Sequence, residues 1–105
     1  VGAGLAVLGA RTSDEDYSEV LSSLKRPHGE YFKMFYGDTA MFGSSSAFPT
    51  GIDYFGPDHV VFSTDAPFAP VAETFESLKR MELEAGVQKK LYKENAERLM
   101  NRSFD

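Results

Sequence analysis

One segment, residues 54–68, constrains the fold more than any other part of the chain, because it combines a helix end, a strand and a carboxylate. Gly56 and Pro57 end any helix before them, since glycine accepts a left-handed cap and proline lacks the amide proton that continues helical hydrogen bonds. The β-branched and aromatic residues that follow do not alternate with polar ones, which is typical of a strand covered on both faces of a parallel sheet. The sequence therefore predicts an α/β fold with a buried parallel strand near residues 59–63.

Asp65 is the candidate functional residue of this segment. It follows Ser63 and Thr64 where the predicted strand runs out, and Pro67 prevents a simple continuation of that strand. Sheets of α/β proteins place their chemistry at the carboxyl ends of their strands. By pattern alone, an aspartate in this position is either a turn or helix-cap residue or a metal ligand.

A second strand and a connecting helix are predicted before this segment. The strand lies near residues 35–39, where Gly37 weakens it locally. Residues 44–46 are serines, whose hydroxyl groups can cap the start of a helix. The apolar face of that helix consists of Phe48, Ile52 and Phe55. The order strand, helix, strand predicts a right-handed parallel crossover.

Two helical pieces are predicted nearer the start of the chain. Capping-box patterns precede a helix from Asp14 to Leu24. That helix ends before the Arg26–Pro27 pair, because the residue before a proline is pushed out of the helical region. A short helical turn is predicted at residues 30–35.

The last third of the chain is predicted to hold two helices. Pro70 opens the first, and Gly86 breaks it. Its apolar face consists of Val71, Phe75 and Leu78. The second helix covers residues 87–100, and Asn95 is expected to cap its second half. Its apolar stripe consists of Val87, Leu91 and Leu99.

Three motifs, which together span about two-thirds of the chain, resemble a known superfamily. They are FYGDTA at residues 35–40, FGPDHVVFSTDAPF at residues 55–68 and YKENAERLM at residues 92–100. In order and spacing they resemble the amidohydrolase superfamily, in the branch that includes aminocarboxymuconate semialdehyde decarboxylase and related aromatic-acid decarboxylases. The resemblance implies that the motifs are the seventh strand, the eighth strand with its metal-binding aspartate, and the closing helix of a (β/α)₈ barrel.

The length of the chain limits how much of such a barrel it can form. A complete barrel needs roughly 250 residues, and this chain has 105. We therefore expect residues 1–105 to be a single partial domain, the C-terminal βαβα segment of a TIM-barrel metal-dependent hydrolase. The family's His-x-His motif on strand one and its later histidine ligands have no counterpart here, so the isolated chain is expected to be inactive.

The resemblance implies that Asp65 is a catalytic residue and the ligand of a divalent metal, expected to be zinc, whose other ligands would be histidines. A carboxylate suits this task because it is a hard oxygen donor, and a bound metal keeps it ionised while its second oxygen stays free. Asp38 ends the other strand at the same rim, where it would orient a ligand, touch substrate or cap the neighbouring backbone. Thr64 would donate a hydrogen bond to Asp65.

Further residues near this rim or near the strands have more than one interpretation. Aromatic and proline side chains could wall an apolar substrate pocket or belong to the core; these are Phe42, Pro67 and Phe68. His59 begins the second strand and His28 is expected in a loop before the first, so both should lie at the opposite rim from Asp65. Their positions therefore exclude them as partners of that carboxylate.

Composition narrows the class of partner. The formal net charge is −5 and the sequence has no basic stripe, which argues against nucleic acid. There is no cysteine, so neither a disulfide framework nor a thiolate metal site is possible, as is typical of cytoplasmic proteins. No apolar run is long enough to span a bilayer, so no membrane partner is expected.

Two classes of function remain open. The first is a metal-dependent enzyme that decarboxylates or hydrolyses a small aromatic or unsaturated carboxylic acid. The second is a non-catalytic packing or oligomerisation module derived from such a barrel. A pair of strands with exposed edges is a poor free-standing fold, so either version requires the rest of the barrel or another copy of the chain as a partner.

Overall fold

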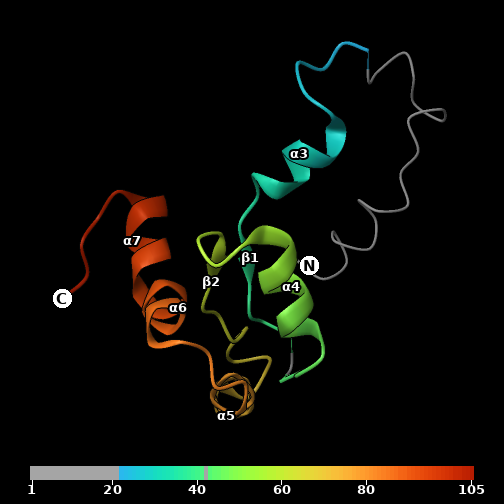
Figure 1. Ribbon diagram of the computed structural model, residues 1–105. Coiled ribbons are helices and arrows are strands. Elements are labelled where there is room, and N and C mark those ends of the chain that lie inside the picture. The colour runs from blue at the N-terminus through green and yellow to red at the C-terminus, as the bar shows by residue number, and fades with distance from the viewer. Residues whose placement is uncertain (1–21, 42) are drawn as a thin grey trace.

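The computed structural model describes residues 22–41 and 43–105, drawn in colour in Figure 1. The elements in chain order are α3 (His28–Lys33), β1 (Gly37–Asp38), α4 (Ala47–Phe55), β2 (Val60–Val61), α5 (Val71–Arg80), α6 (Ala85–Lys89), the π-helix η1 (Lys90–Glu94) and α7 (Asn95–Met100). In this part of the chain no helix combines the length and apolar character needed to cross a bilayer.

The two strands pair in parallel, as predicted, with Gly37 opposite Val60. Two further backbone bonds extend the pairing beyond the strand ends. The Gly37 amide donates to the His59 carbonyl at 2.9 Å, and the Thr39 amide donates to the Val61 carbonyl at 3.2 Å. Both strands are shorter than the predicted spans of residues 35–39 and 59–63, and the crossover between them runs through α4.

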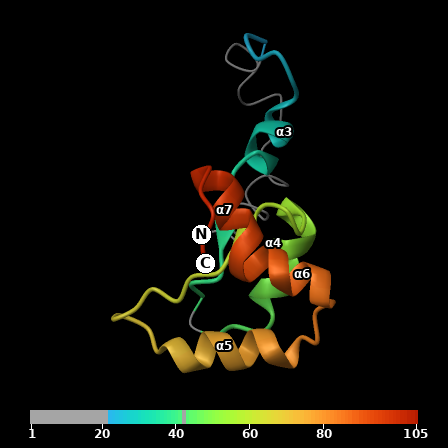
Figure 2. The ribbon, with the colours of Figure 1, turned by 90° about the vertical axis from the view of Figure 1, so that its left-hand side faces the viewer.

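The core lies where three helical elements meet one face of the sheet. It consists of Phe48, Phe55, Val60, Leu78 and Leu91. Figure 2 shows α4 and α6 on the same side of the strands, with α5 running across the bottom of the view. Val60 is buried, whereas Val61, on the other face of β2, is only half-buried. Within the described residues, β2 is therefore covered more completely on the face of Val60 than on the face of Val61.

The C-terminal helical segment also contacts the outer edge of β2. The Phe62 amide donates to the Leu91 carbonyl at 2.9 Å, and Asn95 Nδ2 donates to the Val60 carbonyl at 2.7 Å. The Asn95 amide donates to Lys90, five residues earlier, rather than to Leu91 as an α-helix would require. The π-turn thus leaves the Leu91 carbonyl available to the strand.

The last helix is confirmed in extent but not in detail. The chain is helical from Ala85 to Met100, close to the predicted residues 87–100. Leu91 is buried, but Leu99 is exposed, because the π-turn shifts the register of the residues that follow it. Asn95 does not cap the second half of the helix, since its side chain binds the backbone before and within β2.

The predicted break at Gly86 is wrong. Gly86 lies inside α6, whereas α5 ends at Arg80. The chain turns between these helices at Glu82, whose φ of 48° places it in the left-handed region. A left-handed residue cannot continue a right-handed helix, so the break falls at Glu82 rather than at the glycine.

The predicted apolar face of α5 is confirmed for Leu78 but wrong for its other two residues. Val71 and Phe75 are exposed, and the buried residues are Thr74, Ser77 and Leu78. The small polar face packs against the loop after β1, where Ser77 Oγ donates to the Gly43 carbonyl at 2.7 Å. This close approach turns the aromatic side of the helix outwards.

The remaining local predictions have mixed outcomes. The helical turn at residues 30–35 corresponds to α3, but His28 starts that helix instead of lying in a loop, because the backbone turns at Pro27. The helix α4 is confirmed, although Ser46 at its N-cap makes no side-chain capping bond. The predicted helix from Asp14 to Leu24 falls almost entirely outside the described residues.

Gly43 offers a test of this packing. Its φ is 71°, and a Cβ there would lie 3.2 Å from both the Glu73 carbonyl oxygen and Ser77 Oγ. We expect Gly43→Ala to lower the free energy of unfolding by about 1–3 kcal/mol, through backbone strain and the lost contact with α5. Gly51→Ala is the matched control, because a Cβ there meets nothing within 4 Å, and it should stabilise the helix by up to about 1 kcal/mol. Urea unfolding of both variants measures the difference, and equal effects would contradict this packing.

Candidate functional site

Asp65 lies in the loop between β2 and α5, which projects away from the strands and helices in Figure 2. Its φ of 62° places it in the left-handed region, and its carbonyl accepts bonds from the amides of Phe68 at 2.9 Å and Ala69 at 3.1 Å. The Asp65 residue is exposed, and within residues 22–41 and 43–105 its carboxylate makes no hydrogen bond or ion pair. The backbone therefore forms the turn while the carboxylate stays unengaged.

The start of this loop is held by Thr39, which was not among the predicted site residues. Thr39 follows β1 and is 1% exposed. Its Oγ1 donates to the Ser63 carbonyl at 2.7 Å and accepts from the Ser63 amide at 2.9 Å. The ends of the two strands are thus tied by one hydroxyl group, two residues before Asp65.

The other predicted site residues lie around the same rim. Asp38 Oδ1 accepts a bond from the Ala40 amide at 3.0 Å, so this exposed carboxylate caps its neighbouring backbone. Thr64 Oγ1 accepts a weaker bond from the Ala66 amide at 3.3 Å. Phe68 is 83% exposed. Pro67 is exposed as well, and Phe42 lies outside the described residues.

The two histidines lie before the strands, whereas Asp65 lies after one. His59 immediately precedes β2, where its ring stacks on Tyr36 with centroids 4.5 Å apart. His28 begins α3, ahead of β1. In the part of the chain that the structure describes, no three metal-ligating side chains gather in one place. Asp65 is therefore a single oxygen donor in the described part of the chain; His59 lies at the amino end of β2, and His28 lies farther back, at the start of α3.

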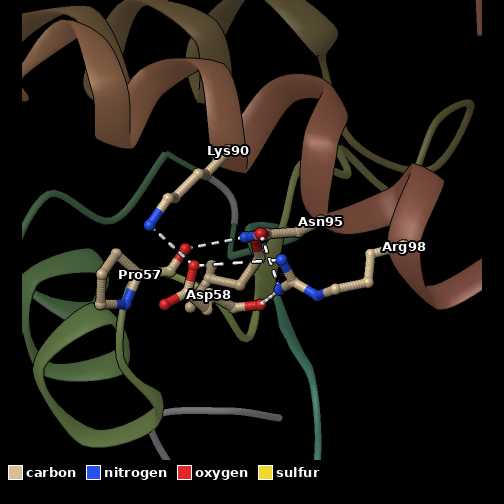
Figure 3. Close-up of polar contacts among 6 residues, drawn as sticks. Pro57, Asp58, Lys90, Asn95 and Arg98 are labelled. Atoms are coloured by element: carbon tan, nitrogen blue, oxygen red, sulfur yellow. Dashed lines mark hydrogen bonds and ion pairs between the residues drawn. The ribbon is translucent and has the colours of Figure 1, made fainter.

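A second polar cluster lies at the amino end of β2, and Figure 3 shows its members converging on Asp58. Lys90 Nζ lies 2.8 Å from Asp58 Oδ1, and Arg98 donates to the Asp58 carbonyl. Asn95 Nδ2 donates to the Pro57 carbonyl at 2.8 Å, and Asn95 Oδ1 accepts from Arg98 at 3.1 Å. This cluster clamps the start of β2 to η1 and α7.

The electrostatics of the clamp favour a structural role. The hydrogen bond from Lys90 holds the pKa of Asp58 below its ordinary value, with Arg98 acting in the same direction. The Asn95 side chain is 0% exposed and uses both its amide nitrogen and its oxygen. Its position four residues after the buried Leu91 was the available sequence signal, because a polar residue on a buried helical stripe needs partners.

Comparison with protein families and solved structures identifies similar proteins. A family model described as amidohydrolase matches residues 3–102. Among curated proteins, none matches the chain.

Three of the similar solved structures are decarboxylases. A 2,6-dihydroxybenzoate decarboxylase in complex with 2,6-dihydroxybenzoate has a TM-score of 0.74 and 23% identity, over 93% of this chain and 32% of that one. The 5-carboxyvanillate decarboxylase of Sphingomonas paucimobilis has a TM-score of 0.72 and 22% identity, over 86% and 28%. A dihydroxybenzoic acid decarboxylase from Polaromonas sp. JS666, with bound manganese and the inhibitor 2-nitroresorcinol, has a TM-score of 0.67 and 27% identity, over 77% and 25%.

This chain spans between a quarter and a third of the length of those proteins. The likeness confirms the predicted fold class, a C-terminal βαβα segment of a (β/α)₈ barrel.

Asn95 provides a test of the clamp. Asn95→Asp keeps the shape of the side chain but turns a buried donor into a carboxylate facing two backbone carbonyls. We expect this change to lower the free energy of unfolding by about 3 kcal/mol or more. Asn101→Asp makes the same substitution at an exposed residue with φ of 49°, and should cost less than about 1 kcal/mol. Thermal unfolding of the two variants measures the difference, and similar losses would argue against the clamp.

The Asp58 ion pair predicts a pH dependence of stability. Because the folded chain lowers the pKa of Asp58, the paired carboxylate stabilises the fold above the unfolded pKa, and this contribution is lost as the pH falls through the folded value. We expect the unfolding midpoint to fall on acidification below about pH 4. Asp58→Asn should make that fall shallower, and an unchanged slope would show that the pair does not contribute.

Proposed function

The chain belongs to the amidohydrolase family, and from this membership we propose that it is the C-terminal portion of a metal-dependent enzyme that decarboxylates a small aromatic or unsaturated carboxylic acid. The single observation that carries the proposal is the carboxylate of Asp65 after β2, which is exposed and makes no hydrogen bond or ion pair with the described residues. Carboxyl ends of barrel strands are where the chemistry of this fold is located.

The proposed cofactor is a divalent metal, and Asp65 would hold it. The fit rests on the donor, because an exposed carboxylate is a hard oxygen ligand that Zn²⁺ and Mn²⁺ both accept. The family resemblance led us to expect zinc, but the Polaromonas decarboxylase structure contains manganese, so both ions should be tested. When bound, the metal would supply Lewis-acid polarisation of a substrate oxygen. The other ligands would come from the rest of the barrel.

The proposed substrate is an aromatic acid rather than an amide or ester. Three similar structures are named as decarboxylases, and one holds 2,6-dihydroxybenzoate, which supports decarboxylation over hydrolysis. In this chain the exposed ring of Phe68 could cover an apolar substrate face three residues from Asp65. Asp38 and Thr64 lie at the same rim, where their polar groups could orient the substrate or the metal-bound carboxylate.

The alternative is a non-catalytic packing or oligomerisation module, which the exposed apolar surface favours. Val71 is 52% and Phe75 46% exposed, and the Phe75 ring continues into Tyr92 with centroids 6.0 Å apart. An aromatic surface of this kind marks a contact with another structure. If the chain is part of an enzyme, the partner that contacts this surface is the rest of the barrel. If it is a packing module, the partner is another copy of the chain.

Metal titration tests the first proposal on the chain itself. One carboxylate cannot close a four-coordinate site, so we expect Zn²⁺ and Mn²⁺ to bind the isolated chain with dissociation constants of about 1 mM or weaker. Asp65→Asn should abolish that binding, and Asp53→Asn, an exposed carboxylate on α4, should not. Calorimetry and manganese spin resonance measure both ions. Tight stoichiometric binding by the isolated chain would contradict an incomplete site.

Activity in a complete barrel that carries residues 1–105 tests the reaction. We expect Asp65→Asn to lower kcat/KM for decarboxylation of a dihydroxybenzoate by at least about 100-fold, because the metal would lose a ligand. Asp53→Asn should change it less than about twofold. Sedimentation of the isolated chain helps to separate the alternatives. The packing module would be favoured if the isolated chain formed a stable, discrete dimer and the complete barrel showed no metal-dependent activity.

A further inference from the structure

The contact between Thr39 and Ser63 replaces a regular part of the sheet. In a parallel ladder the Ser63 amide would donate to a backbone carbonyl of the neighbouring strand. Here it donates to Thr39 Oγ1 at 2.9 Å, and the same hydroxyl donates back to the Ser63 carbonyl at 2.7 Å. Thr39 also bonds β2 through its own backbone amide, which donates to Val61. One buried residue therefore contacts Val61 in β2 and Ser63, two residues later, in the segment that follows the strand.

The hydroxyl contact marks the point at which the chain leaves the sheet. Immediately after Ser63 the backbone begins a turn, in which the Ala66 amide donates to Thr64 Oγ1. Asp65 adopts its left-handed conformation in this turn, and its carbonyl closes the turn by accepting the Phe68 amide. The pair of hydrogen bonds to Thr39 therefore holds the backbone at Ser63, two residues before Asp65.

The side chains of Asp38 and Ser63, which lie beside this contact, do not make it. Asp38 directs its carboxylate to the Ala40 amide, on its own strand. Ser63 takes part in the contact through its backbone atoms, so its side chain is not required. Among the described residues, the side chain that binds the backbone of Ser63 is therefore the buried hydroxyl group of Thr39, which follows β1.

We propose that Thr39 is a positioning residue, whose hydroxyl group fixes the backbone at Ser63 and so orients the Asp65 carboxylate for metal binding. The proposal rests on the assignment of Asp65 as a metal ligand. It assigns Thr39 no contact with substrate or metal.

The test compares Thr39→Val, which keeps the branched shape without the hydroxyl, with Thr39→Ser, which keeps the hydroxyl. Ser63→Ala is the matched control, because it removes a hydroxyl while leaving both backbone atoms. Nuclear magnetic resonance of the 105-residue chain follows amide exchange at Ser63, the amide-to-α-proton coupling that reports φ at Asp65, and broadening of Asp65 signals by Mn²⁺.

For Thr39→Val we expect about tenfold faster exchange at Ser63, loss of the left-handed coupling at Asp65, and weaker Mn²⁺ broadening there. Thr39→Ser and Ser63→Ala should match the parent chain in all three. An unchanged Asp65 coupling in Thr39→Val, or a Thr39→Ser variant that behaves like Thr39→Val, would overturn the positioning role.

Two further outcomes keep this test separate from the proposed function. If Mn²⁺ does not broaden Asp65 in the parent chain at millimolar concentration, the metal assignment fails, while exchange and coupling still decide whether Thr39 fixes the loop. If Thr39→Val does not fold, Thr39→Cys takes its place, since a thiol is a weaker donor and acceptor. It should give faster exchange at Ser63 than Thr39→Ser, and identical behaviour would overturn the proposal.

Discussion

The arrangement depends on one buried amide, the side chain of Asn95, which joins the C-terminal helical segment to the second strand. Two strands of two residues each cannot form a stable sheet alone. Each strand buries too little surface, and the backbone groups on its outer edge would lack hydrogen-bond partners. Asn95 donates to Pro57 before β2 and to Val60 within it. The helix is thus hydrogen-bonded to the strand as well as packed on it.

Hydrogen bonds also cover the edges of the two-stranded sheet. The outer edge of β2 is occupied by Asn95 and by the Leu91 carbonyl that the π-turn leaves free. Beyond the end of β1, the Asp38 carboxylate accepts a hydrogen bond from the Ala40 amide. Without this bond, that amide would be available to pair with another strand. Exposed strand edges invite pairing with other chains, and polar or helical cover on both sides limits it.

Local chemistry predicted much of this fold, and the failures have physical causes. The helix end at Gly56 and the positions of both strands depend on residues within a few positions, so they could be read directly. The face of α5 could not, because Val71 and Phe75 follow the helical period of a buried stripe, whereas the contact with Gly43 is made by the small polar side. An unpartnered barrel segment leaves apolar residues exposed that periodicity assigns to a core.

The candidate site was predicted in the same uneven way. The position of Asp65 after a strand followed from the local pattern, whereas its predicted metal role and the position of Asp38 at the rim followed from the family resemblance. Thr39 left no local signal, since its partner Ser63 is 24 positions away and is engaged through its backbone. Asn95 was visible as a polar residue in a helix, but the π-turn that aims it at β2 cannot be read from a 3.6-residue period.

The left-handed backbone at Asp65 has a consequence for which amino acids can occupy this position. Such a conformation is tolerated by glycine, asparagine and aspartate and is strained for β-branched or bulky residues. Of the three tolerated types, aspartate alone carries a charge. The main-chain conformation therefore restricts position 65 to a few amino acids, and aspartate is the one among them that offers an anionic oxygen.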